Sequence, residues 1–391
     1  MDSTVTSPAT DIRSGTRAVL LDMARCMVAR TAFVADGRDA IDWDALLDLA
    51  RAHRLVELCG RLMDSLPPDI VLAPVRGRWM SERLLFAASA LSAVQELSRV
   101  LRVLTDARVH ALAYKGPALS LAAYGDVGAR VCTDLDLVVS PHEFARARTA
   151  LVSAGYRSRP GMSRGQEAVL CFGQGHAEYA RAATPAPFVE LHWRFVAQRL
   201  PWSPDVSDVL ARSVPLQVGG VGASVPSDAD HVLLLSMHGT RHHWTQLEWL
   251  VSLSAFLRRD FDGEAVLERA TRIGARRALL VGTALADTLL HAAAPAALAR
   301  AAASDAVVRG TVAAFAKALT VGAPGRPVAD VGERTLLHRR RDVARRFAAR
   351  LFLPTRREWE LVRLPTILAP LYVPLRLLRL GTRPALLGED A

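Results

Sequence analysis

Lysine is nearly absent from this chain of 391 residues: of its 49 basic residues only Lys115 and Lys317 are lysines, and the other 47 are arginines. A composition rich in Arg and Ala is typical of a GC-rich genome, so the number of arginines carries little functional information. The two lysines are more informative, because a chain biased so strongly toward Arg has kept an ammonium group at each of those positions.

Cysteine and long apolar runs are also scarce. The cysteines are scattered without CxxC spacing, which excludes the usual zinc motifs and a disulfide framework: Cys26, Cys59, Cys132 and Cys171. The polar segment Met1–Gly15 has no apolar core of a signal peptide. The run Leu364–Leu375 is too short to span a bilayer and contains three prolines. We therefore expect a cytoplasmic protein without a transmembrane segment.

The positive charge is unevenly distributed. The net charge is +10, and residues 334–391 contribute +8 of it through 13 arginines against five acidic residues. The preceding chain is nearly neutral, so a nucleic-acid partner is possible but not favoured. In this basic tail we expect Arg339–Arg346 to be exposed and residues 351–380 to pack. The exposed arginines would form either a solvated face or a docking surface for an anionic partner.

Hydrophobic periodicity predicts an α+β fold, with a small mixed-sheet core flanked by N- and C-terminal helical regions. We place the boundaries at residues 1–100, 101–200, 201–325 and 326–391, the last being the basic tail. Helices are expected over 16–100 (broken near Pro67-Pro68 and Pro74), 117–124, 141–154 and 227–319. Strands are expected over 109–114, 133–140, 168–172, 176–180 and 187–195.

Two carboxylates alternate in the strand predicted at Thr133–Ser140. Asp134 and Asp136 stand at i and i+2, so their side chains leave the same face of the strand. Adjacent carboxylates repel each other unless a cation lies between them, and Mg²⁺ is the usual one near phosphates. The motif is short, however, and two solvated aspartates at a strand end are the other interpretation.

Two further features bear on that choice. Upstream, an apolar strand runs into Lys115-Gly116-Pro117 and a helix, and such a turn offers free N–H groups and positive charge to a phosphate. Downstream, Glu190 and His192 share one face of another predicted strand. Glu190 would complete a two-metal site with the aspartates. The alternative interpretations are that Lys115-Gly116-Pro117 is an ordinary strand-to-helix turn, that Glu190 is a solvated strand residue and that His192 is a core histidine.

The order of these motifs resembles a known family. Lys115-Gly116, a helix, Arg130, the Asp-x-Asp pair, a helix ending at Gly155-Tyr156 and Glu190-Leu-His-Trp193 follow one another as in the bacterial uncharacterised nucleotidyltransferase family. That family belongs to the polymerase-β-like nucleotidyltransferases, and its members occur among tailoring genes for lasso peptides and polysaccharides. The resemblance covers roughly residues 50–260 and includes the segment His242–Leu250.

The resemblance implies roles for individual residues. Asp134, Asp136 and Glu190 match the catalytic, metal-binding carboxylates, which hold Mg²⁺ or Mn²⁺ in the family. Gly116 matches the glycine that cradles the nucleotide phosphates, with Lys115 beside it. Arg130 and His192 fall where the family has an Arg and a His near the triphosphate. Two positions depart from the pattern: Pro117 replaces the usual serine of the turn, and Ser252 stands where an Asp is common.

The sequence thus predicts an enzyme that moves a nucleotidyl group from an NTP to a hydroxyl-bearing acceptor (peptide, sugar or small molecule), such as a natural-product precursor. The alternative is a non-catalytic protein of the same fold whose basic tail docks an anionic partner. His238 and His242 have the i, i+4 spacing of metal ligands but lack the HExxH glutamate, so helix packing or pocket lining is favoured. Trp244 and Trp249 are expected to pack between the helical region and the sheet.

Overall fold

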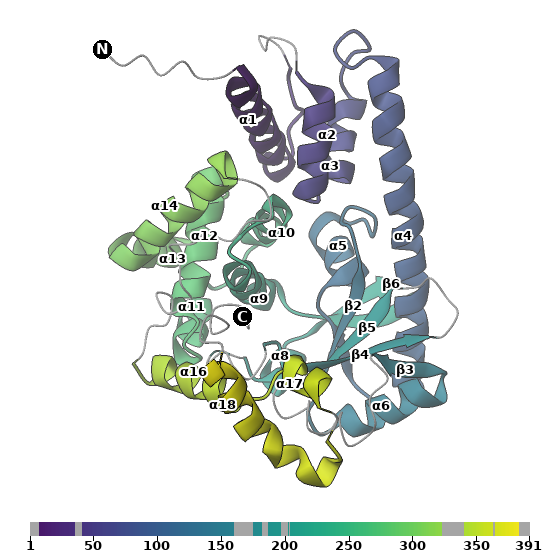
Figure 1. Ribbon diagram of the computed structural model, residues 1–391. Helices are drawn as coiled ribbons and strands as arrows, with labels where there is room; N and C mark the ends of the chain where they lie inside the picture. The colour runs from purple at the N-terminus through teal and green to yellow at the C-terminus, as the bar shows by residue number, and fades with distance from the viewer. Residues whose placement is uncertain are drawn as a thin grey trace. The chain divides into compact units, whose positions relative to one another are not determined.

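The computed structural model describes residues 8–35, 41–159, 175–181, 187–196, 202, 204–322, 340–362 and 364–382 (Figure 1). The chain forms two compact units, each assembled from three separate segments. The first unit combines residues 1–94, 116–132 and 227–336, and the second combines residues 95–115, 133–226 and 337–391. The expected α+β class is confirmed, because a mixed sheet and extensive helices are both present.

The first unit is helical. Its helices are α1 (Pro8–Ala29), α2 (Trp43–Ala52), α3 (Val56–Asp64), most of α4 (Ala73–Asp106), α5 (Gly116–Tyr124), α9 (Asp228–Arg241), α10 (Leu247–Leu257), α11 (Gly263–Arg272), α12 (Arg276–Leu290), α13 (Ala296–Ser304) and α14 (Ala306–Val321). Side-chain oxygens accept backbone N–H bonds at several helix starts, as at Asp42, Ser227, Asp262 and Asp305. The expected proline break is confirmed, since Pro67 and Pro68 lie between α3 and α4.

Trp244 occupies the core of the first unit. Its side chain is fully buried, and two glycines leave room for the ring. A Cβ atom on Gly239 of α9 would lie 2.5 Å from ring atoms, and one on Gly282 of α12 would lie 2.9 Å away. Larger residues at either position would therefore force the ring out of the core. The expectation that Trp244 packs in the core is confirmed, but the expected position between the helical region and the sheet is wrong, because the ring lies between helices α9 and α12 of the first unit.

His238 of α9 and His242 at the C-cap of that helix also have a packing role. The ring centroids of His238 and His242 lie 4.6 Å apart, and both rings contact Trp249 of α10, at 5.1 and 5.5 Å between centroids. Aromatic pairs at these separations stabilise helix packing. The interpretation of these histidines as packing residues is supported by these contacts.

The second unit is built around a seven-stranded mixed sheet. Its strands are β1 (Ala111–Ala113), β2 (Asp134–Val139), β3 (Tyr156–Arg159), β4 (His176–Arg181), β5 (Phe188–His192), β6 (Val214–Val218) and β7 (Val221–Val225), in the order β3-β4-β5-β2-β1-β7-β6. The pairs β2·β5 and β1·β7 are parallel, and all others in the sheet are antiparallel. Helix α6 (Phe144–Ser153) packs beside β3, and α8 (Val206–Ala211) precedes β6 (Figure 1).

The expected elements around the Asp-x-Asp motif are confirmed. Gly125 and Gly155 follow α5 and α6 with φ of +73° and +89°, values at which glycine is the natural helix terminator. The strand expected over 168–172 lies outside the described residues. The hairpin β6–β7 was not predicted, although Gly219-Gly220 between valine-rich segments is a hairpin signal: both have positive φ, 57° and 75°.

The end of α4 is joined to the sheet by a buried carboxylate. Glu96 accepts a hydrogen bond from the Tyr156 hydroxyl of β3 at 2.5 Å and lies 3.3 Å from the Arg181 guanidinium of β4. The charge of Arg181 and the hydrogen bond from Tyr156 compensate the free-energy cost of burying the Glu96 carboxylate. By length and composition alone, α4 is the one helix in the described ranges that would suffice to cross a bilayer, a test that core helices of globular proteins also meet.

The basic tail contains α16 (Arg340–Phe352), α17 (Arg356–Leu361), the 3₁₀ helix η1 (Thr366–Leu371) and α18 (Tyr372–Thr382). The fully buried Glu358 pairs with Arg376, also fully buried, and with Arg379. The expectation of packing over 351–380 is therefore correct for Glu358, Tyr372 and Leu380. It is wrong for several apolar side chains, which are at least half exposed: Phe352, Leu361, Ile367 and Leu371. Arg340 and Arg345 are exposed, as expected.

Candidate functional site

Strands β2 and β5 bring three acidic side chains to one face of the sheet. The two strands are parallel neighbours, and their register places Asp136 beside Glu190. Asp134 lies two residues earlier on β2, so its side chain leaves the same face, while Leu135 and Leu137 are buried on the other. Standard strand spacing puts the Cα atoms of Asp134 and Glu190 about 8 Å apart. The three carboxylates predicted from the sequence therefore converge.

Two basic side chains bind the central carboxylate. Asp136 is 2% exposed, and its Oδ1 accepts a hydrogen bond from Lys115 Nζ at 3.0 Å. The same oxygen lies 3.0 Å from His192 Nε2, which is also 3.1 Å from Glu190 Oε2. Lys115 follows β1 directly and its ammonium lies 4.9 Å from the centroid of the Tyr114 ring. Lys115, Asp136, Glu190 and His192 thus form one connected polar cluster.

The charges of this cluster stabilise each other. Burial opposes ionisation of Asp136, but the charge of Lys115 and the hydrogen bond with His192 hold the pKa of Asp136 well below its usual range. Burial likewise opposes the positive charge of Lys115, yet Asp136 raises the Lys115 pKa above its ordinary value. The pKa of His192 is raised because its hydrogen bonds with Asp136 and Glu190 outweigh its burial.

Asp134 has the opposite environment. Burial and the charges of Asp136 and Glu190 raise the pKa of Asp134 to about 6. Glu190 is also partly buried, but its hydrogen bond with His192 lowers its pKa, which keeps it ionised. Burial and the two neighbouring carboxylates therefore disfavour the ionised form of Asp134. An additional cation on this side of the cluster would be stabilised.

His176 joins the cluster from β4, and the sequence analysis did not identify it as a site residue. The antiparallel register of β4 and β5 places it directly opposite His192, and the two imidazole centroids lie 4.8 Å apart. One ligand atom each of His176, Glu190 and His192 lies within 4.8 Å of the others. The sequence signal that could have identified His176 was the alternation of side chains along its strand. His176 and Glu178 share one strand face, as Glu190 and His192 do.

Aromatic packing covers one side of the His192 ring. The Tyr114 ring meets it edge-on at 5.5 Å between centroids, and Phe195 packs edge-on against Tyr114 at 5.4 Å. His192 is consequently 6% exposed. Low exposure restricts solvent and strengthens the electrostatic interactions of the cluster.

The remaining two predicted site residues, Gly116 and Arg130, belong to the first unit. Gly116 opens α5 with a φ of +62°, a conformation that favours glycine. The Arg130 guanidinium forms a two-pronged ion pair with the buried Glu248, including a 3.0 Å bond from Nη2 to Oε2. The roles of both residues toward a nucleotide stay predictions.

Ser252, which departs from the family pattern, has a structural partner. Its hydroxyl donates to Glu248 and lies 2.9 Å from the Tyr124 hydroxyl. The network Arg130–Glu248–Ser252–Tyr124 satisfies the polar groups that α5 and α10 bury together. Ser252 therefore contributes to the hydrogen bonding of a buried ion pair.

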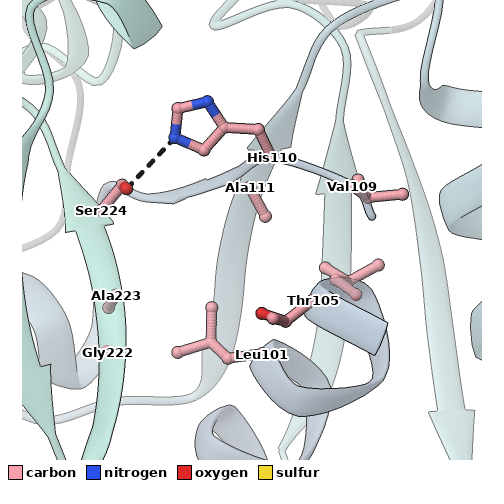
Figure 2. Close-up of a pocket in the computed structure, with 9 residues that line it drawn as sticks. Leu101, Thr105, Val109, His110, Ala111, Gly222, Ala223 and Ser224 are labelled. Carbon is pink, nitrogen blue, oxygen red and sulfur yellow. Dashed lines mark hydrogen bonds between the residues drawn. The ribbon is translucent and has the colours of Figure 1, made fainter. Parts of the chain in front are cut away.

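A separate pocket of about 280 Å³ lies at the other end of β1 (Figure 2). The end of α4 lines it together with β1 and β7, and His110 Nε2 lies 3.2 Å from the Ser224 hydroxyl at its edge. Leu101 and Ala223 are among its apolar lining residues. The pocket contains no carboxylate, so it lacks the chemistry of the acidic cluster.

Comparison with known proteins gives one family. No curated protein matches the chain. A family model described as "Uncharacterised nucleotidyltransferase" matches residues 39–291, which is more than half of the sequence and includes every residue of the polar cluster. The chain therefore belongs to this uncharacterised nucleotidyltransferase family.

Proposed function

We propose that the protein transfers a nucleotidyl group from an NTP to a hydroxyl-bearing acceptor, with Asp134, Asp136 and Glu190 as its catalytic carboxylates. The observation that supports this most directly is the β2·β5 register, which sets Asp136 beside Glu190 with Asp134 on the same face. Family membership supports nucleotidyl transfer in general.

The carboxylates fit a divalent cation. Hard cations such as Mg²⁺ prefer oxygen ligands from carboxylates and substrate phosphates, and Mn²⁺ accepts the same ligands. Asp134, Asp136 and Glu190 supply such oxygens, and a cation beside Asp134 would relieve the repulsion that Asp136 and Glu190 exert on it. When bound, the metal would supply charge neutralisation for the triphosphate and activation of the attacking oxygen.

In the proposed reaction, the acceptor oxygen forms a bond to the α-phosphorus of the NTP. The bond between that phosphorus and the bridging oxygen toward the β-phosphate breaks, and pyrophosphate leaves with the bonding electrons. Glu190 accepts the proton of the acceptor hydroxyl. Lys115 and His192 neutralise the triphosphate.

The acceptor class and cellular setting remain part of the proposal. A peptide, sugar or small molecule with an accessible hydroxyl fits the chemistry, and tailoring of a peptide natural product in the cytoplasm is the setting we propose. The proposed acceptor class and the proposed setting are both compatible with any nucleotide base.

The direct test is pyrophosphate release from each NTP by the full-length chain with Mg²⁺ or Mn²⁺. We expect release with at least one NTP and its loss in Asp134→Asn. An exposed aspartate outside the cluster provides the matched control, Asp69→Asn, which should retain wild-type release. Equal rates in the wild type and Asp134→Asn would contradict the proposal.

The basic tail favours a second candidate, a non-catalytic protein that docks on an anionic lipid surface. The tail exposes arginines next to apolar side chains, a combination suited to such a surface: Arg340, Arg345, Arg357, Phe347, Phe352, Ile367 and Leu371. The chain should then sediment with anionic vesicles at low salt and lose binding as salt screens the charges. Vesicle binding without pyrophosphate release would favour this candidate, and release without vesicle binding would contradict it.

A further inference from the structure

The acidic cluster contains two imidazoles that a magnesium site does not need. His176 and His192 form a cross-strand pair on β4 and β5, and Glu190 lies on the same face two residues before His192. Direct cross-strand neighbours and i, i+2 positions share one face of a sheet, so the backbone itself brings these three side chains together. One ligand atom of each lies within 4.8 Å of the others.

We propose that His176, Glu190 and His192 form a binding site for a borderline divalent transition-metal ion of the Zn²⁺ and Co²⁺ class. Imidazole nitrogen is a preferred ligand of Zn²⁺ and of the neighbouring transition metals, whereas Mg²⁺ strongly prefers oxygen. Two histidines and one carboxylate are an established ligand set for Zn²⁺ with an open coordination position.

The surroundings of the three residues suit such an ion. His192 Nε2 lies within 3.1 Å of Glu190 Oε2 and 3.0 Å of Asp136 Oδ1, so two carboxylates already share a positive charge or proton at this nitrogen. A bound divalent ion would replace that proton and receive the Nε2 lone pair. Asp136, held by Lys115 at 3.0 Å, stands beside the site as an oriented carboxylate.

The site also has an accessible side. His192 is buried under the Tyr114 ring, but His176 and Glu190 are only partly buried. An ion can therefore enter over His176 while the rings behind His192 hold that ligand in place. Fixed ligands on strands and an open approach are features of a metal site that binds and releases its ion.

The proposal distinguishes two ligand sets that share Glu190. Asp134 and Asp136 offer only oxygen ligands beside Glu190, whereas His176 and His192 offer nitrogen ligands. Binding of the transition metal stands without the proposed function, but its use in nucleotidyl transfer rests on that function. In that case Zn²⁺ or Co²⁺ in combination with Mg²⁺ should support higher pyrophosphate release than Mg²⁺ alone.

The binding test uses the full-length chain, stripped with a chelator and free of nucleotide. Zn²⁺ affinity is measured by calorimetry in the presence of excess Mg²⁺, and Co²⁺ is added separately to record its visible ligand-field bands. We expect Zn²⁺ to bind despite the excess Mg²⁺, and His176→Ala to weaken it by about tenfold or more. The control His142→Ala changes an exposed histidine of the second unit and should bind Zn²⁺ as the wild type does.

A second measurement needs no variant and so does not depend on variant folding. Pulsed electron paramagnetic resonance of the Co²⁺-loaded wild type should detect nitrogen coupling from imidazole ligands. Absence of that coupling, or equal Zn²⁺ affinity in His176→Ala and the wild type, would overturn the site.

The variant Asp134→Asn separates the two proposals. It should lose pyrophosphate release but retain Zn²⁺ binding. If the wild type binds Zn²⁺ through His176 but releases no pyrophosphate with any NTP, the proposed function fails and the metal site stands. If release depends on Asp134 but Zn²⁺ affinity is unchanged in His176→Ala, the metal site fails and the function stands.

Discussion

The two aspartates of one motif should respond in opposite ways to the same substitution. From the sequence alone, the carboxylates of the cluster are expected to repel one another. Removal of one charge, by Asp134→Asn or Asp136→Asn, is then expected not to destabilise the fold. The structure supports this only for Asp134. Asp136 is buried and holds Lys115 and His192, so its charge is attractive to its neighbours. Asp136→Asn leaves the partly buried ammonium of Lys115 without its counter-charge.

The magnitudes follow from these environments. Removing one partner of a buried ion pair costs about 3–5 kcal/mol, and Asn keeps an acceptor oxygen, so we expect Asp136→Asn to destabilise by about 3 kcal/mol. For Asp134, a pKa raised from 3.8 to about 6 means that its charge opposes folding at neutral pH. Its removal should stabilise the chain by at most about 3 kcal/mol, and by less after solvent screening.

Thermal unfolding at neutral pH in metal-free buffer is the assay. With about 2 °C per kcal/mol for a chain of this size, Asp136→Asn should lower the midpoint by about 6 °C, while Asp134→Asn should leave it unchanged or raise it. Asp69→Asn, at an exposed position, is the control. A shift of the same sign and size in both motif variants would refute the assignment of Lys115 and His192 to Asp136.

Three further predictions concern other parts of the chain. Lys115→Met should lower NTP affinity in calorimetry by about tenfold, or 1.4 kcal/mol, and also lower the thermal midpoint, because Asp136 loses one of its two cations; unchanged affinity would contradict the phosphate role. Glu248→Gln should cost about 3–5 kcal/mol in urea unfolding because Arg130 loses its buried partner, and a double-mutant cycle with Arg130→Met should show the coupling. His53 is buried, with Nδ1 accepting the Leu247 N–H, and burial together with the charge of Arg17 lowers its pKa from 6.5 to about 4. Protons therefore favour the unfolded chain, so stability should fall by up to about 3 kcal/mol between pH 6.5 and 4, and His53→Asn should reduce that loss.

Local elements were largely predictable because their signals are short-range. The alternation of Asp134–Val139 identified β2, since a period of two places polar and apolar residues on opposite faces. Gly125 and Gly155 marked helix ends because glycine adopts positive φ without a Cβ clash. The hairpin around Gly219-Gly220 had an equally local signal and was predictable on the same grounds.

The pairing of strands had no comparable signal. That β5 lies beside β2, more than fifty residues away in sequence, follows from packing of the whole sheet. The convergence of Asp136 and Glu190 was therefore a hypothesis from two strand faces, supported by the order of motifs in a family, and the spacing of the residues alone left it open. The entry of His176 likewise required the β4·β5 register, because only that register places it opposite His192.

By itself, the sequence determined which residue types were available for chemistry and on which face of its own strand each one stands. Only the tertiary structure decided their charge partners. Lys115 became the partner of Asp136 and Arg130 the partner of Glu248, while burial and two neighbouring carboxylates raised the pKa of Asp134. The physical reason is that side-chain alternation is a property of one strand, whereas burial and ion pairing depend on which elements pack together.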